Sequence, residues 1–284
     1  MKKIFFILAM LFTAQLSAQQ PIEMLLWPDG APNSNGLAAP EEQLEGGRVA
    51  GVVNPTITVY RASKPNGMAI VACPGGGYVR LAMNHEGHDM ADWFNAQGIT
   101  YVVLKYRMPN GHHEVPRSDA EQAIRLVRQH ASEWGVNPQR IGIMGASAGG
   151  HLAASVATLH SDASVRPDFQ VLFYPVVSMQ KGITHNGSRT ALITEDASKE
   201  LEQLYSLEQQ VNAQTPPAFI MLSADDKSVI PQNSIDYFLA LRKHGVSATM
   251  HIYPEGGHGW GFRDSFVYKS QWTSELTKWL QQLH

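Results

Sequence analysis

A serine lies among small residues at positions 145–149, between an apolar run and a segment that favours a helix. Residues 140–144, which precede it, have the character of a buried strand, and residues 151–157 follow with a helix-compatible pattern. This order of strand, tight turn and helix is the setting of a Gly-x-Ser-x-Gly nucleophile elbow. Because such a turn is strained and closely packed, bulk two residues on either side of Ser147 should clash. The pattern predicts an α/β sheet with the Ser147 hydroxyl held out at its upper edge.

A carboxylate and a histidine follow in later segments, in the chain order that a Ser-Asp-His triad on such a sheet requires. Residues 217–222 form an apolar, strand-like run that ends at two adjacent aspartates. Residues 248–253 alternate as a strand does and lead into a glycine-rich loop that carries His258. Each piece alone is typical of an ordinary polar turn. The three pieces in this order predict a serine hydrolase in which His258 takes the proton from Ser147.

The adjacent aspartates Asp225 and Asp226 leave two choices for the acid that orients the histidine. In many hydrolases of this type the acid stands three residues before a valine that starts the turn into a helix, and Asp226 stands so before Val229. We therefore predict Asp226 as the acid. Asp225 stays open as the alternative, its other role being to accept hydrogen bonds from its own loop.

A glycine-rich loop after an earlier strand is the expected source of oxyanion donors. The apolar run 68–73 leads directly into Gly75, Gly76 and Gly77, where backbone N–H groups can approach a developing oxyanion without intervening side chains. Ala148, directly after the serine, supplies the other N–H. A phosphate-binding loop is the alternative, but neither a following Lys-Ser/Thr pair nor a Gly-x-Gly-x-x-Gly spacing is present.

Several partner classes are not expected. His85 and His88 are three residues apart, whereas two zinc-binding histidines on one helix face need a spacing of four, so no metal is predicted. The formal net charge is −3 without a basic stripe, so nucleic acid is not an expected partner. The acyl-transfer chemistry needs no cofactor.

Glu86 and Arg107 are expected to form a structural ion pair beneath the glycine loop.

Strands and helices alternate along most of the chain, which indicates a mostly parallel sheet with helices on both faces in a single domain. We expect a signal peptide at residues 1–18, an N-terminal arm at 19–54 and the α/β domain at 55–284. Residues 178–215 form a modest insertion that should roof the pocket.

Two details of that fold are predicted more closely. Residues 56–60 alternate as an edge strand does. Ser118 and Glu121 have the spacing of a capping box, so a helix should open there and run to about Trp134.

The N-terminus has the pattern of a secretory leader. Lys2 and Lys3 precede an apolar run at residues 4–12, and small residues stand before Gln19. The run is too short to span a bilayer, so a secreted or periplasmic enzyme without a membrane anchor is expected after cleavage. Cys73 is the one cysteine of the sequence, which excludes an intramolecular disulfide.

Several stretches together resemble one group of α/β hydrolases, the bacterial carbohydrate esterases that include acetylxylan and feruloyl esterases and are relatives of the hormone-sensitive-lipase-like enzymes. The matching segments lie at residues 73–78, 85–87, 104–107, 145–151, 184–189, 215–217, 225–227 and 256–261.

The resemblance implies an α/β-hydrolase fold, the triad Ser147, Asp226 and His258, and an oxyanion hole built by the glycine loop and Ala148. The lipase relatives have histidine before the three glycines, whereas this chain has Pro74, so which two glycines face the oxyanion stays open.

The expected activity is removal of acetyl, or feruloyl, groups from plant polysaccharide such as xylan. A prolyl-oligopeptidase-like serine peptidase and an esterase of other small esters are the alternatives. Tyr78 and Trp260 adjoin the oxyanion loop and His258, so they either stack on the substrate or fill the core. The oligomeric state stays open.

Overall fold

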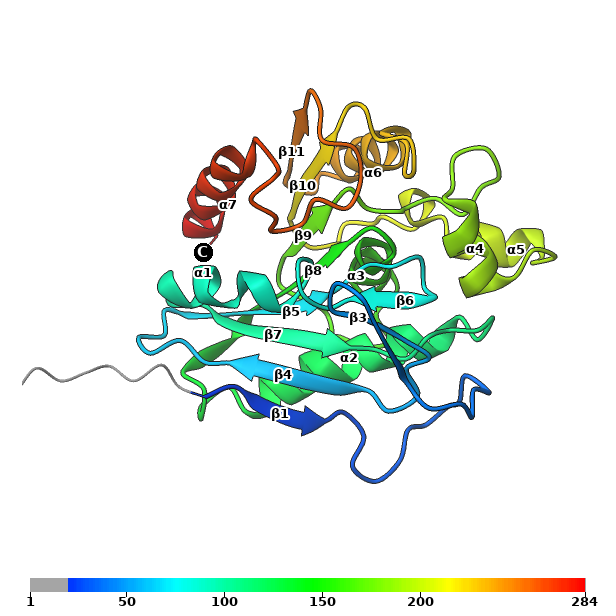
Figure 1. Cartoon of the computed structure of the whole chain (residues 1–284). Coiled ribbons are helices and arrows are strands. Elements are labelled where there is room, and N and C mark those ends of the chain that lie inside the picture. Colours follow the sequence, from blue (N-terminus) through cyan, green and yellow to red (C-terminus); the bar gives the residue numbers. More distant parts are fainter. Residues whose placement is uncertain (1–19, 284) are drawn as a thin grey trace, which may run out of the picture.

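An eight-stranded sheet forms the centre of the computed structural model, which describes residues 20–283 (Figure 1). Its strands lie in the order β1-β4-β7-β5-β8-β9-β10-β11. The pairs β1–β4 and β4–β7 are antiparallel and all the others are parallel, so the prediction of a mostly parallel sheet is confirmed. The predicted leader at residues 1–18 lies outside the described residues.

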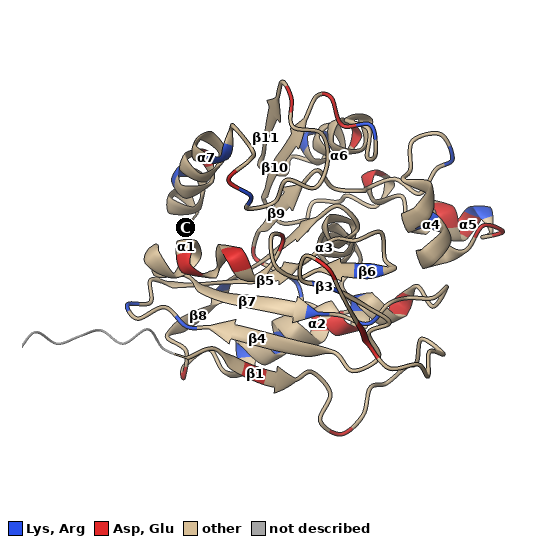
Figure 2. Cartoon of the chain, in the orientation of Figure 1, with Lys and Arg blue, Asp and Glu red and all other residues tan. Residues whose placement is uncertain are grey.

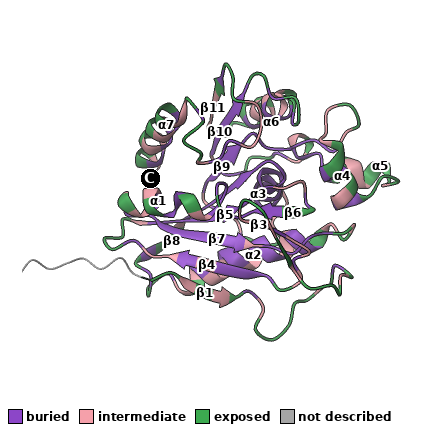
Figure 3. Cartoon of the chain, viewed as in Figure 1, coloured by how far each residue is buried: buried purple, intermediate pink, exposed green. Residues whose placement is uncertain are grey.

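The strands of this sheet are β1 (Ile22–Leu25), β4 (Thr56–Tyr60), β5 (Gly67–Cys73), β7 (Thr100–Lys105), β8 (Val136–Ala146), β9 (Gln170–Phe173), β10 (Ala218–Ser223) and β11 (Ala248–Tyr253). The central strands form apolar runs because helices cover both of their faces. Strands β5, β9 and β10 contain no charged residue (Figure 2), and nearly all of their side chains are buried (Figure 3).

The helices lie on both faces of the sheet, with α1 and α7 on one and α2, α3 and α6 on the other (Figure 1). Their bounds are η1 (His88–Met90), α1 (Ala91–Ala96), α2 (Glu114–Gln129), α3 (Ala148–Leu159), α4 (Asn186–Ile193), α5 (Lys199–Leu204), η2 (Leu207–Gln209), α6 (Gln232–Lys243) and α7 (Lys269–Gln282). Trp93 of α1 packs edge-on against Trp272 of α7, with ring centroids 5.7 Å apart. No helix within residues 20–283 is long and apolar enough to cross a bilayer.

Two local predictions are wrong. Strand β4 is not an edge strand, because β1 from the N-terminal segment pairs along its outer side. Helix α2 begins at Glu114, so Ser118 lies inside the helix and its hydroxyl donates to the carbonyl of Val115. The helix also ends at Gln129, because the following residues turn toward β8.

A second sheet lies beside the carboxyl ends of the central strands. It contains β2 (Glu42–Leu44), β3 (Arg48–Ala50) and β6 (Arg80–Ala82) in that order. Strands β2 and β3 come from the N-terminal segment, and β6 follows the glycine loop after β5. The N-terminal segment therefore contributes one strand to the large sheet and two to the small one, and the small sheet brings residue 48 next to residue 82.

Candidate active site

Ser147 stands at the sharp turn between β8 and α3, with φ 55° and ψ −121°. Residues other than glycine rarely adopt this backbone conformation, and it stores strain of roughly 1–3 kcal/mol. The turn excludes side chains at its flanks, since a Cβ at Gly145 would lie 2.0 Å from the carbonyl oxygen of Gly149. A Cβ at Gly149 would lie 2.0 Å from the carbonyl oxygen of Cys73. The small residues of the motif are therefore required by close backbone packing.

His258 lies between the serine and a buried aspartate. The Ser147 hydroxyl donates to His258 Nε2 at 2.8 Å, and His258 Nδ1 donates to Asp226 Oδ2 at 2.6 Å. These roles follow because an ionised carboxylate can only accept, which assigns the proton to Nδ1 and leaves Nε2 as the acceptor. The Asp226 side chain is fully buried, and its Oδ1 accepts from the backbone N–H groups of Ser228 and Val229. The carboxylate is thus held in one orientation toward the imidazole.

Asp225 faces a different partner. Its Oδ1 accepts from the backbone N–H of Gly257 at 2.8 Å, and the residue is exposed. This contact ties the loop after β10 to the loop that carries His258. It is the loop-bonding role that the sequence left open for Asp225, and the structure brings Asp226 to the imidazole.

The glycine loop lies opposite the serine, but its three glycines are not equivalent. The N–H of Gly75 donates to Glu86 Oε2 at 2.8 Å, so this group is already engaged. Gly76 and Gly77 line the cavity that contains Ser147. This hydrogen bond corrects the expectation for Gly75 and leaves the N–H groups of Gly76 and Gly77 as the candidate oxyanion donors of the loop. Ala148 is the first residue of α3, where backbone N–H groups have no acceptor within the helix.

A buried hydrogen-bond chain connects the glycine loop to the histidine loop. Glu86, which accepts from Gly75, also accepts at Oε1 from the hydroxyl of Tyr174 at 2.8 Å. That hydroxyl accepts from the N–H of Gly261 at 2.8 Å. The Tyr174 ring packs edge-on to the His258 imidazole, with centroids 4.7 Å apart. Burial raises the pKa of the Glu86 carboxyl.

The sequence prediction for Glu86 is wrong. The side chain does not pair with Arg107, which instead forms hydrogen bonds to the carboxylate of Asp119. Arg107 follows β7, and its partner is in α2, so this ion pair fastens a helix to the sheet. The sequence did not identify Tyr174 as a residue of the site. Tyr174 directly follows the strand 170–173, just as Ser147 directly follows its own strand, so the same signal was available.

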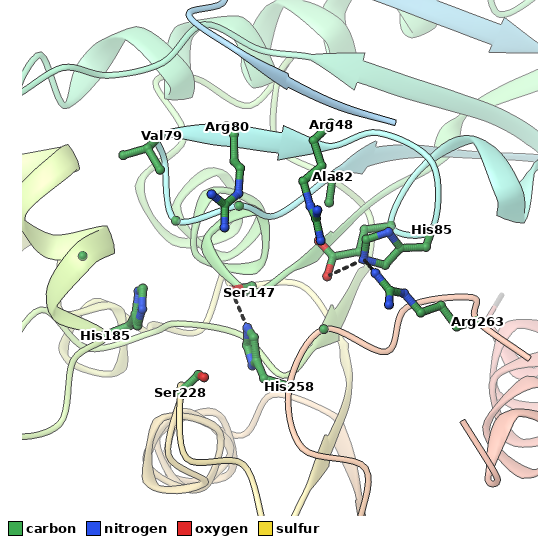
Figure 4. Close-up of a pocket in the computed structure, with 15 residues that line it drawn as sticks. Arg48, Val79, Arg80, Ala82, His85, Ser147, His185, Ser228, His258 and Arg263 are labelled. Carbon is green, nitrogen blue, oxygen red and sulfur yellow. Dashed lines mark hydrogen bonds and ion pairs between the residues drawn. The ribbon is translucent and has the colours of Figure 1, made fainter. Parts of the chain in front are cut away.

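A cavity of about 450 Å³ opens over Ser147 and His258 (Figure 4). Its walls contain small residues, among them Ala82 and Gly187, and cationic or imidazole side chains. Burial and the nearby His258 lower the pKa of the His185 imidazole, which lines the same cavity close to Gly77. No group of side chains able to hold a metal ion is found within residues 20–283.

The two aromatic side chains proposed for substrate stacking belong to the core. Tyr78 is 1 % exposed, and its hydroxyl contacts His151 Nδ1 at 3.0 Å. Trp260 is 4 % exposed, with its indole stacked on Phe266 at 4.0 Å between ring centroids. Neither ring has a free face, which corrects the stacking expectation in favour of core filling. Cys73 is also buried, and burial raises the pKa of its thiol.

Comparison with known families supports the assignment of the fold. Residues 70–262 match a family described as the alpha/beta hydrolase fold. A crystal structure of an acetyl ester-xyloside bifunctional hydrolase from Caldicellulosiruptor lactoaceticus superposes with a TM-score of 0.77 at 35 % identity, covering 92 % of this chain and 95 % of the other.

Two curated relatives carry related names. An acetylxylan esterase of Xylanibacter ruminicola is 42 % identical over 228 residues, which are 79 % of this chain and 47 % of the relative. Endo-1,4-beta-xylanase B of Butyrivibrio fibrisolvens is 33 % identical over 204 residues, which are 67 % of this chain and 32 % of the relative. The chain therefore spans less than half the length of these two relatives.

Proposed function

The chain belongs to the alpha/beta hydrolase fold family, and on that premise we propose that it is a carboxylic ester hydrolase that removes acetyl groups from xylan-type polysaccharide. The observation that carries the proposal is the continuous hydrogen-bonded array from Ser147 through His258 to the buried Asp226 at the floor of an open cavity. This array is the geometry that activates a serine for acyl transfer.

The first step forms an acyl-enzyme. The Ser147 Oγ attacks the ester carbonyl carbon while His258 Nε2 takes the hydroxyl proton, and the imidazolium that forms is stabilised by Asp226. The tetrahedral intermediate collapses as the carbon–oxygen bond to the sugar breaks, and His258 returns the proton to the departing sugar hydroxyl. In the second step water attacks the acetyl-serine carbonyl carbon while His258 Nε2 takes a proton from the water. The bond between that carbon and Ser147 Oγ then breaks, His258 returns the proton to Ser147 Oγ, and acetate leaves.

Negative charge develops on the carbonyl oxygen in both steps. The backbone N–H groups of Ala148 and of Gly76 and Gly77 lie at the edges of the turn and loop that flank Ser147, so they are the donors assigned to this oxygen. Loss of one such donor typically lowers kcat by roughly 10²–10³-fold. The chain Gly75–Glu86–Tyr174 supports the loop from behind, since it holds the first glycine in place.

Several features support acetyl as the acyl group. Small residues such as Gly76, Gly77 and Ala82 line the cavity that contains Ser147, so an acetyl ester can approach the hydroxyl without a steric clash. The names of the relatives, an acetylxylan esterase and an acetyl ester-xyloside hydrolase, point to acetylated xylan-type carbohydrate. A feruloyl ester is the alternative substrate if the chain is an ester hydrolase, and a peptide bond is the alternative if it is a peptidase.

We also propose that the enzyme is exported by the leader at residues 1–18, because its substrate is a polymer that does not enter the cell. N-terminal sequencing of the protein recovered from the medium or the periplasm tests this. A mature N-terminus near Gln19 supports export, and an intact Met1 on cytoplasmic protein contradicts it.

Release of acetate and ferulate from acetylated, feruloylated xylan tests the substrate proposal. We expect acetate without ferulate, together with hydrolysis of 4-nitrophenyl acetate and no cleavage of a peptide anilide. Cleavage of the aryl ester alone would refute the polysaccharide substrate and retain the ester hydrolase. Cleavage of the anilide with no acetate release would favour the peptidase.

A further inference from the structure

Three arginines surround the cavity above the triad. Arg48, Arg80 and Arg263 all line it together with Ser147 (Figure 4). Arg80 and Arg263 are exposed and Arg48 is half-buried, so all three guanidinium groups are accessible from the cavity. Guanidinium groups recognise carboxylates and phosphates, often through two parallel hydrogen bonds.

The small sheet determines where two of these side chains point. Arg48 of β3 is paired with Ala82 of β6, and Arg80 stands two residues before Ala82 in the same strand. Because side chains two residues apart share a face of a strand, Arg48 and Arg80 lie on the same face of this sheet. The intervening Val49 and Leu81 are buried on its other face. The sheet thus presents two cations to the cavity while it anchors two apolar residues in the core.

The three arginines lack carboxylate partners. Within residues 20–283, none of the three guanidinium groups lies within 4.0 Å of a carboxylate oxygen, although Arg107 and Arg189 elsewhere are paired in this way. Arg48 donates only weakly to a backbone carbonyl, at 3.4 Å. The chain as a whole has a net charge of −3, so the positive charge at the cavity is local. Surface guanidinium groups clustered without counter-charges repel one another, and an anionic ligand would relieve that repulsion.

The other polar groups of the cavity do not neutralise this cluster. Glu86 is 4 % exposed, and both of its oxygens already accept hydrogen bonds from Gly75 and Tyr174. His85 Nε2 contacts the guanidinium of Arg263 at 3.2 Å. Burial, and then the nearby arginines, lower the pKa of His85 to about 4, so at neutral pH its Nε2 accepts from Arg263 and orients that guanidinium.

We propose that Arg48, Arg80 and Arg263 form a subsite for a carboxylate of the substrate, carried by an acidic sugar unit adjacent to the acetylated one. The assignment of this carboxylate to the sugar rests on the proposed function, because an esterified acetyl group carries no ionisable group of its own. The enzyme then prefers acetyl esters that neighbour a uronic acid to those in a neutral stretch of the polysaccharide.

A matched pair of substrates tests this preference. The first is an acetylated xylo-oligosaccharide with a glucuronic acid branch, and the second is the same compound with the carboxyl group reduced to the alcohol. We expect kcat/KM to be about tenfold higher for the acidic substrate, the range that a charge-assisted hydrogen bond supplies. We expect Arg80→Gln to lower this ratio toward one, mainly through KM, and 0.5 M NaCl to reduce it as well.

Arg242→Gln is the control variant, since Arg242 is an exposed residue near the end of α6 and does not line the cavity. It should leave both substrates unaffected. Equal kcat/KM values for the two substrates in the wild-type enzyme would overturn the subsite and leave the ester hydrolase intact.

Direct binding provides a readout that does not depend on turnover. Calorimetric titration of Ser147→Ala with methyl glucuronide should show binding that is weakened by Arg80→Gln and unaffected by Arg242→Gln. Binding of inorganic phosphate without binding of the glucuronide would assign the cluster to another anion and refute the uronate. If neither acetylated substrate nor 4-nitrophenyl acetate is hydrolysed, the proposed function fails, and the titration still decides whether the anion subsite exists.

Discussion

Substitution of Asp226 by asparagine should remove the charge that orients His258 while it keeps the shape of the site. The amide oxygen can still accept from the N–H groups of Ser228 and Val229, which now bond to Oδ1. The amide nitrogen then faces His258 Nδ1 in place of the Oδ2 that lies 2.6 Å from it. Because an NH₂ group donates, the imidazole must accept at Nδ1 and carry its proton at Nε2, where it can no longer take the proton of Ser147.

The size of this effect follows from the wrong tautomer. In serine hydrolases with this arrangement, the same exchange of carboxylate for amide lowers kcat by about 10⁴-fold. This corresponds to about 5.5 kcal/mol of lost transition-state stabilisation. The assay is kcat for 4-nitrophenyl acetate at pH 7, accompanied by urea unfolding of each variant to show that the fold is retained.

Asp225→Asn is the matched control for this measurement. Asp225 is the neighbouring residue, it is exposed, and an amide oxygen can replace the carboxylate oxygen that accepts from Gly257. We expect kcat to change by less than about tenfold, since a single neutral hydrogen bond contributes about 1 kcal/mol. A large loss in Asp225→Asn with near-normal turnover in Asp226→Asn would refute the assignment of the acid.

Three further outcomes follow from the structure. Glu86→Gln should lower kcat for 4-nitrophenyl acetate by on the order of tenfold with little change in KM, because an NH₂ group, which only donates, replaces one of the two oxygens that accept from Gly75 and Tyr174; unchanged kcat would show that this chain does not position the loop. Gly149→Ala should lower the free energy of unfolding in urea by about 1–3 kcal/mol, because its Cβ would meet a backbone oxygen at 2.0 Å; an unaltered midpoint would contradict the close packing of the turn. Burial lowers the pKa of His151 from 6.5 to about 4, so between pH 6.5 and pH 4 the imidazole is protonated in the unfolded chain and neutral in the folded one. The contribution of this group to the free energy of unfolding is therefore complete above pH 6.5 and falls as the pH drops toward 4. Urea titrations at pH 7 and pH 5 should show a loss of about 2 kcal/mol from this group that is absent in His151→Gln, and an equal loss in both proteins would refute it.

The elements that carry the triad could be predicted because each is encoded locally. The strand 248–253 agrees with β11 at both ends, and the apolar runs before Ser147 and Asp226 end within one or two residues of β8 and β10. A buried parallel strand is a contiguous apolar run, and the catalytic side chains follow where such runs end. Strand, turn and residue type therefore coincide in one short stretch of sequence.

The hydrogen-bond chain behind the oxyanion loop could not be predicted in this way. Tyr174 and Glu86 are 88 positions apart, and their contact exists only because β9 and the loop after β6 converge at the same edge of the sheet. The expected Glu86–Arg107 pair failed for a related reason. That pair was inferred only from the expected position of both residues beneath the glycine loop, without regard to other carboxylates. In the fold, the Asp119 carboxylate of α2 accepts from the Arg107 guanidinium.

The cluster of Arg48, Arg80 and Arg263 also could not be predicted from local sequence patterns. Strands β3 and β6 are three residues long, too short for any alternation of polar and apolar residues to identify them as strands. Arg48 comes from a segment that the sequence identified only as an arm at residues 19–54. Its position beside the cavity depends on pairing between β3 and β6 across more than thirty residues.

The role of Ser147 as the nucleophile is tested most directly by turnover of 4-nitrophenyl acetate by the Ser147→Ala variant. The Ser147 Oγ is the atom that His258 Nε2 contacts at 2.8 Å, and alanine removes this atom with little other change. We predict a fall in kcat of roughly 10⁶-fold, with urea unfolding that shows an intact fold. Turnover within tenfold of the wild-type enzyme would contradict the account, because acyl transfer would then not pass through this serine.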